Sequence, residues 1–131
     1  MSAHHTRPAL SRTVRMVDGT TTVTLDGELD LVTAIPLMAH LDVLVSGPHP
    51  DLVLDLRPVS FIDCAGLAVL CRARKRVRAR HGRLRLVTAD TRFLRILRAT
   101  GLGGVFEIHP DLSATEAGTP VAGTSPSAAM G

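Results

Sequence analysis

Apolar residues fall on alternate positions in the segment 20–30, where Val23, Leu25 and Leu29 are separated by polar residues and Gly27. This period of two is typical of a half-buried β-strand. A short strand at 14–17 precedes it, and Asp18-Gly19 lies between the two as a turn signal. The pattern therefore predicts a β-hairpin near the start of the folded domain.

The spacing then becomes helical. A helix that begins at Thr33, with Pro36 in its first turn, is ended by the Ser-Gly-Pro sequence at 46–48. It places one group of apolar residues on a common side: Leu37, Met38, Leu41, Leu44 and Val45. The run at 51–56 has apolar residues at consecutive positions, which predicts a central strand covered on both faces.

The second half of the domain continues this alternation of helical and strand spacing. A helix is predicted at 66–80, a strand at 84–87, a helix at 91–100 and a last strand at 105–108. The first of these helices turns four residues inward, Leu67, Leu70, Cys71 and Val77. Strands that alternate with helices predict an α/β domain with a small, mixed, mostly parallel sheet.

Both ends of the chain lack such a period. Residues 1–12 are predicted to form a flexible arm. Residues 114–131 are rich in Ala, Gly, Thr, Ser and Pro, and cannot bury enough apolar surface to offset the entropy of ordering them. We therefore expect one domain at 13–113, followed by a disordered tail.

Composition excludes several classes of protein. The 131 residues contain no Trp, no Tyr and three Phe, too few for a platform that stacks nucleic-acid bases on aromatic rings. No apolar run approaches the roughly 18 to 20 residues that span a bilayer, and the first ten residues lack the apolar core of a secretory signal. If one helix carries Cys64 and Cys71, they lie about 10.5 Å apart along it, beyond disulfide reach. We expect a cytoplasmic protein with reduced thiols and no membrane insertion.

Charge is distributed unevenly along the chain. Residues 1–63 hold four arginines against eight acids, a net charge of −4, whereas residues 71–100 hold eleven basic residues against one acid, a net of +10. The basic segment at 72–98 can attract nucleic acid, an anionic surface or an acidic protein face. It is equally explained as a solvated helix face in a chain rich in arginine.

Motifs for catalysis are missing from the sequence. There is no GxSxG elbow, no GxxxxGK[ST] loop and no HExxH. GLGG at 101–104 follows a helix rather than a strand, so a helix end explains it, and the six histidines are scattered without metal-ligand spacing. We expect no enzyme, no catalytic residue, no cofactor and no metal site.

One cluster stands out, the sequence SFIDCAGL at 60–67, where a strand passes into a helix. Small residues at Cys64, Ala65 and Gly66 leave the first backbone N–H groups of the helix open to an anion or to a polar group of a partner. Asp63 can accept hydrogen bonds from a partner, or it can serve only as a helix cap with Gly66 as a packing residue.

At these residues the chain resembles the STAS family, the sulfate-transporter and anti-sigma-factor-antagonist domain. The likeness covers about residues 13–112 in four segments: GELD at 27–30 followed by Thr33-Ala34, DLVLDLRPVSFID at 51–63, AGLAVL at 65–70 and LRILRATGLGGVFEI at 94–108. It implies the fold of that family, a small sheet with helices packed on one face. The chain's size and composition indicate the anti-sigma factor antagonist branch rather than a transporter's tail domain.

In that branch the resemblance implies a partner-switching regulator of transcription. The antagonist binds an anti-sigma factor that is also a serine kinase and so frees the sigma factor; the kinase phosphorylates a serine at the strand-to-helix turn, docking fails, and a phosphatase restores it. The implied partner-binding residues are Asp30, Thr33, Asp63, Cys64, Ala65, Gly66 and Leu67. Nucleic acid is not an expected partner.

Cys64 departs from the family pattern. The turn usually reads Asp-Ser-Ser-Gly or Asp-Ser-Ala-Gly with the first serine phosphorylated, and Cys64 occupies that position. A thiol is not the substrate of a serine kinase, so we expect the docking surface to persist without the phosphoryl switch. Cys64 is then an inert stand-in, a redox-sensitive thiol at a helix start, or the mark of another STAS role. Ser60, beside Phe61, is a poor substitute site.

Two other functions stay open. Because STAS domains also serve transporters, the chain can be a scaffold or an accessory protein of a transport system. The basic segment at 72–98 allows a binder of nucleic acid or of an anionic surface, although it lacks a recognition helix flanked by a turn motif and lacks aromatic platforms.

Overall fold

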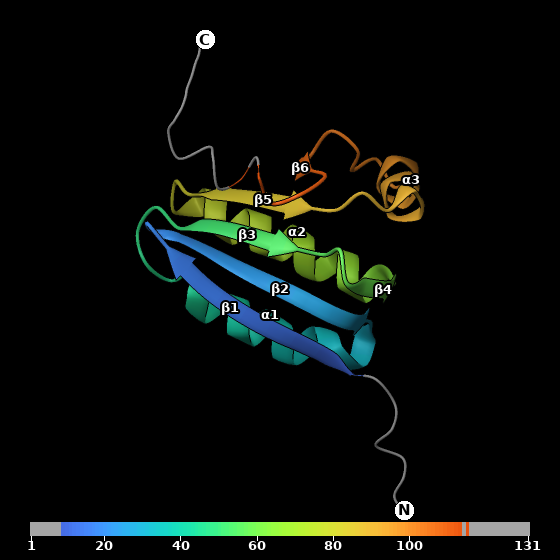
Figure 1. The fold of residues 1–131 in the computed structure, drawn as a ribbon, viewed down its shortest axis with the longest axis horizontal. Coiled ribbons are helices and arrows are strands. Elements are labelled where there is room, and N and C mark those ends of the chain that lie inside the picture. Colours follow the sequence, from blue (N-terminus) through green and yellow to red (C-terminus); the bar gives the residue numbers. More distant parts are fainter. Residues whose placement is uncertain (1–8, 114, 116–131) are drawn as a thin grey trace, which may run out of the picture.

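The computed structural model describes residues 9–113 and 115, in which strands and helices alternate along the chain (Figure 1). The elements are β1 (Leu10–Val17), β2 (Thr20–Leu29), α1 (Leu31–Leu44), β3 (Asp51–Asp55), β4 (Val59–Ile62), α2 (Cys64–Ala79), β5 (Arg83–Val87), α3 (Thr91–Ala99) and β6 (Glu107–His109). Residues 1–8 of the predicted arm and nearly all of the predicted tail lie outside the described residues.

The strands form one mixed sheet in the order β1-β2-β3-β5-β6. Only β1 and β2 run antiparallel, and every other pair is parallel, as the alternation of strands with helices predicted. β4 lies outside this row and pairs with the end of β2, beyond the point where β3 has stopped. The predicted α/β class with a mostly parallel sheet is confirmed.

The opening hairpin is longer than the sequence predicted. β1 begins at Leu10, so residues 10–12, assigned above to the flexible arm, are strand. The reason is the length of β2, whose ten residues offer partners to the whole of β1, from Thr20 opposite Val17 to Gly27 opposite Leu10. The turn is the predicted Asp18-Gly19, both with positive φ.

The hydrophobic core lies between the sheet and the helices α1 and α2, which run side by side across one face (Figure 1). β3 is the central strand: Leu52 and Leu54 point into this core while Val53 and Asp55 face the other way, and all four are buried. The apolar run at 51–56 therefore corresponds to the predicted central strand, which is buried on both faces. α3 stands past the end of β5 and buries Phe93 and Leu97.

Two helix starts differ from the predictions. α1 begins at Leu31, not Thr33, because Asp30 caps it. α2 begins at Cys64, not Gly66, because Asp63 caps it. β4 was not predicted as a strand separate from the run at 51–56; the sequence indicated only that a strand passes into a helix at 60–67, because four residues give too short a pattern to delimit.

The sheet face opposite the helices carries a buried polar cluster. Arg85, 2% exposed, holds Asp51 through Nη2 at 2.7 Å and donates from Nη1 to the carbonyl oxygen of Thr115 at 3.1 Å. Thr20 donates to the other oxygen of Asp51 at 2.7 Å. A paired charge of this kind is tolerated in a protein interior, and here it fixes Thr115 against β5.

Candidate docking site at the start of helix α2

The turn between β4 and α2 presents the first residue of the helix to solvent. Asp63 is the N-cap, in extended backbone conformation, and its Oδ1 accepts the N–H of Gly66 at 3.1 Å. Its own N–H donates to the carbonyl oxygen of Leu29 at 3.2 Å, which fastens the turn to the end of β2. Cys64 follows as the first helical residue, exposed and without a disulfide.

Gly66 lets the helix approach the sheet closely. A Cβ placed on it would lie 2.6 Å from Cγ1 of Ile62, 2.7 Å from the carbonyl oxygen of Leu29 and 2.8 Å from Cγ of that leucine. Such distances are shorter than carbon atoms tolerate, so a side chain at this position would push α2 away from β2 and β4. Gly66 therefore determines how closely the start of α2, and with it Cys64, packs against β2 and β4.

The start of α1 is the second part of the site. The carboxylate of Asp30 accepts N–H groups of Val32 and Thr33, while Oγ1 of Thr33 accepts the N–H of Asp30 at 2.9 Å. This reciprocal arrangement is a capping box and satisfies donors that the helix itself leaves unused. Thr33 also donates to the carbonyl oxygen of Glu28 at 2.8 Å, which ties the helix start to β2.

The pairing of β2 with β4 brings these two helix starts to one end of the sheet. Leu29 pairs with Ile62, and the next residues along each chain segment are the two caps, Asp30 and Asp63. The predicted residues Asp30 and Thr33 thus belong to the same end of the molecule as the 63–67 turn. Positions more than thirty residues apart in sequence form one surface.

The predicted site residues divide by exposure. Cys64 is exposed, and Asp63 and Ala65 are half-buried, as are Asp30 and Thr33. Gly66 and Leu67 are buried and part of the packing beneath the turn. Both were predicted to bind a partner; because they lie under the surface, they support the turn and do not form its contact face.

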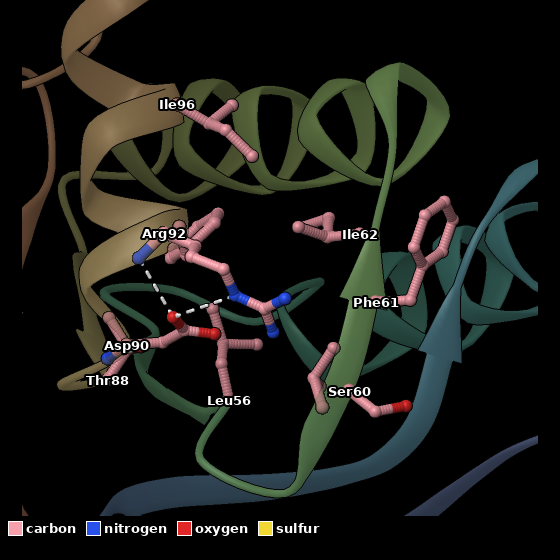
Figure 2. Close-up of a pocket in the computed structure, with 10 residues that line it drawn as sticks. Leu56, Ser60, Phe61, Ile62, Thr88, Asp90, Arg92 and Ile96 are labelled. Carbon is pink, nitrogen blue, oxygen red and sulfur yellow. Dashed lines mark hydrogen bonds and ion pairs between the residues drawn. The ribbon is translucent and has the colours of Figure 1, made fainter.

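Exposed apolar side chains near these caps were missed by the sequence reasoning. Leu31, Val32 and Ile35 are 68, 80 and 67% exposed on the first turns of α1. Phe61 is 50% exposed and lies on the side of β4 away from α3 (Figure 2). The signal was present, because α1 has apolar residues on nearly every side and one sheet face cannot bury them all. Exposed apolar groups gathered at a surface mark an interaction site.

The basic segment is used in part within the protein. Arg72 and Arg76 on α2 both reach Asp42 on α1, at 3.0 and 3.1 Å, and bridge the two helices. The carboxylate of Asp42, through its hydrogen bond and its charge, raises the pKa of Arg72. Arg74 donates from Nε to the carbonyl oxygen of Val105 at 3.1 Å. Arg72 and Arg76 therefore join α2 to α1, and Arg74 joins α2 to the loop before β6, which weakens the argument that this segment exists to bind nucleic acid.

The described part of the chain also bears on metal binding and on membrane insertion. Within residues 9–113 and 115, no three His, Cys, Asp or Glu side chains lie together in a way that would hold a metal ion. No helix in that part of the chain is long and apolar enough to cross a membrane.

Comparison with known proteins gives one family. The model of the STAS domain matches residues 11–115. The anti-sigma-F factor antagonist RsfA of Mycobacterium tuberculosis is 32% identical over 105 residues, which cover 78% of this chain and 81% of RsfA. An anti-sigma-B factor antagonist of Listeria monocytogenes is 35% identical over 82 residues, 63% of this chain and 72% of that protein. The crystal structure of an anti-sigma factor antagonist from Mycobacterium paratuberculosis superposes with a TM-score of 0.70 at 28% identity, covering 90% of this chain and 97% of that one.

Proposed function

We propose, from the premise that this chain belongs to the STAS domain family, that it is an anti-sigma factor antagonist, a non-enzymatic regulator of transcription. It binds an anti-sigma factor and so releases the sigma factor that this partner holds. The observation that carries the proposal is the exposed turn at Cys64 with the two capped helix starts beside it, in a chain whose relatives are named anti-sigma factor antagonists. Since sigma factors act on transcription, we propose that this protein is cytoplasmic.

The docking surface that we propose is centred on Cys64. Polar contacts come from the turn at Asp63 and from the start of α1 at Asp30 and Thr33, while Leu31 and Val32 supply apolar contact area. A surface that combines apolar contact area with polar groups matches the usual composition of protein interfaces. Residues 63–67 thus contribute the exposed side chain of Cys64 and, in Gly66 and Leu67, the buried residues that support it.

We further propose that the partner is an anti-sigma factor with serine kinase activity, and that this chain is not its phosphoryl acceptor. A phosphoryl group would place about two negative charges at the centre of the docking surface, enough to oppose binding. Cys64 has a thiol where such a group would be attached, so binding persists under conditions that switch off a serine-containing paralogue. A phosphatase is then needed only for the paralogues.

Capture from a lysate of the host tests the proposal. Wild type, Cys64→Ser and Cys64→Asp serve as baits, with Cys71→Ser as the matched control because it changes the half-buried thiol of the same helix. Bound kinases are identified, ATP is added, and the intact mass of each bait is recorded. We expect an anti-sigma kinase on wild type, Cys64→Ser and Cys71→Ser but not on Cys64→Asp, with phosphate added only to Cys64→Ser.

Two results would contradict the proposal. Recovery of no anti-sigma factor on any bait removes partner switching as the function. Equal capture by Cys64→Asp and wild type shows that the turn at Cys64 is not the docking surface. Oxidation of Cys64 in the bait masses, together with lost capture, would show a redox-sensitive thiol in place of an inert one.

A further inference from the structure

A pocket of about 240 Å³ lies between β4 and α3, and its lining extends to Ile62 but does not include Cys64 (Figure 2). Its apolar lining comes from six residues: Leu56, Val59, Phe61, Ile62, Phe93 and Ile96. This volume is below the roughly 300 to 1,000 Å³ of pockets that enclose drug-sized ligands, and it suits one or two apolar side chains. The pocket is therefore the size of a receptor for part of a peptide.

β4 borders the pocket with an edge that is available for pairing. The strand pairs with β2 along one side, and the pocket and α3 lie along the other (Figure 2). Among residues 9–113 and 115, no strand pairs with β4 on that second side, because β5, which lies beside β3 there, ends at Val87 opposite Asp55. An open strand edge presents backbone donors and acceptors to which an extended peptide can add as a further strand.

Arg92 places a positive charge at the opening of the pocket. Its side chain is 75% exposed, and its guanidinium extends from α3 over the pocket toward β4 (Figure 2). Nε lies 3.8 Å from Oδ1 of Asp90, a loose contact, while the same carboxylate oxygen caps α3 by accepting the backbone N–H of Arg92 at 2.9 Å. Exposed Arg95 and Arg98 add to the positive charge of this helix. An occupant with carboxylates is favoured over a neutral or basic one.

We propose that this pocket and the edge of β4 bind an extended, acidic segment of a partner protein. The segment pairs with β4, inserts an apolar side chain among Leu56, Phe93 and Ile96, and sets an acidic side chain against Arg92. The three features specify different properties of the segment, namely extended backbone, apolar anchor and negative charge. Since the site does not include Cys64, it holds or fails separately from the proposed function.

The test uses a synthetic heptapeptide, acetylated and amidated at its ends, in which glutamate alternates with valine or leucine. It is titrated into the full, uniformly ¹⁵N-labelled chain, and backbone amide shifts are followed by NMR. We expect shifts confined to residues 59–62 and the first turns of α3. A peptide with lysine in place of glutamate should cause none.

N-methylation of the peptide identifies the binding mode. Methyl groups on one set of alternate amides block the hydrogen bonds toward β4, whereas those on the other set point away. We expect one methylated peptide to lose binding and the other to keep it. Equal binding by both contradicts strand addition.

Variants of the protein test the other two features. Arg92→Gln should weaken binding about threefold, as expected for one exposed charge contact, while the matched Arg95→Gln, exposed on the same helix, should leave it unchanged. Ile96→Glu should weaken it about tenfold, with circular dichroism as the check that it folds. No shifts at millimolar peptide would overturn the proposal. So would binding of decanoate to the pocket without binding of the peptide, which would make it a site for small amphipathic anions.

Discussion

Replacing Gly66 by alanine tests how the turn at Cys64 is held. In an open helix the change would stabilise the protein, because alanine is favoured over glycine by about 1 kcal/mol. At this position the new Cβ would lie 2.6 to 2.8 Å from atoms of Ile62 and Leu29, one of them a backbone oxygen of β2 that cannot move alone. Overpacking of this kind costs about 1 to 3 kcal/mol, and three contacts this short belong to the upper half of that range. After the gain of about 1 kcal/mol from alanine, we expect the free energy of unfolding to fall by about 1 to 2 kcal/mol.

Urea denaturation followed by circular dichroism measures this loss. With a slope of about 2 kcal/mol per molar urea, the middle of the usual range, the midpoint should fall by roughly 0.5 to 1 M. Gly104→Ala is the matched control, because a Cβ there meets nothing within 4 Å, and its midpoint should stay at the wild-type value or rise slightly. A Gly66→Ala protein as stable as wild type would refute the inferred close approach of α2 to the sheet.

Two further changes test the cap of α1 at Asp30 and the ion pair between Arg83 and Glu107 at the edge of the sheet. Asp30→Ala removes the capping box of α1 and should lower the free energy of unfolding by about 1 to 2 kcal/mol in thermal denaturation, whereas the exposed Asp26→Ala should change it little. Burial acts to raise the pKa of Glu107, but hydrogen bonds and charge from Arg83 and His109 outweigh it and hold that pKa below its ordinary 4.5. Ionised Glu107 therefore stabilises the fold above about pH 4.5, and this contribution is lost as pH falls through the lowered pKa. Wild type should exceed Glu107→Gln in stability at neutral pH by under about 1 kcal/mol, since both partners are partly exposed, and the difference should shrink in acid; a constant difference would contradict the assignment.

Most of the element order could be predicted because each main element has a strong local pattern. The alternation around Val23 and Leu25 marks β2, and the continuous apolar run at 51–56 marks the central β3. The cap at Asp63 was also predictable, since an acidic residue before small residues at a helix start has a known local role.

The missed features depend on contacts between distant parts of the chain. β4 is a strand only because the end of β2 extends past β3 and offers Gly27 to Leu29 as partners. The start of α1 at Leu31 depends on the capping box, in which Oγ1 of Thr33 accepts the N–H of Asp30, whereas the position of Pro36 indicated a later start. The role of Arg72 and Arg76 could not be predicted either, because their partner Asp42 lies on another helix.

Under the proposed function, Cys64 would let one position separate docking from control. The thiol is similar in size to a serine hydroxyl group and lies on the same helix start, so the shape of the surface is retained. In this proposal a serine kinase adds no phosphoryl group to the thiol, so the two negative charges that would oppose docking are not added. The Cys64→Asp variant supplies part of that charge permanently, and Cys64→Ser restores the chance of adding it.

Release of a sigma factor is the most direct test of the account. A fluorescently labelled sigma factor is bound to the anti-sigma factor recovered with this chain, and its anisotropy is followed as each variant is added in the presence of ATP. We predict that wild type frees the sigma factor and continues to do so over time, that Cys64→Ser frees it and then loses this ability, and that Cys64→Asp frees none. Unchanged anisotropy at saturating wild-type protein, or full release by Cys64→Asp, would contradict the claim that this chain antagonises an anti-sigma factor through the turn at Cys64.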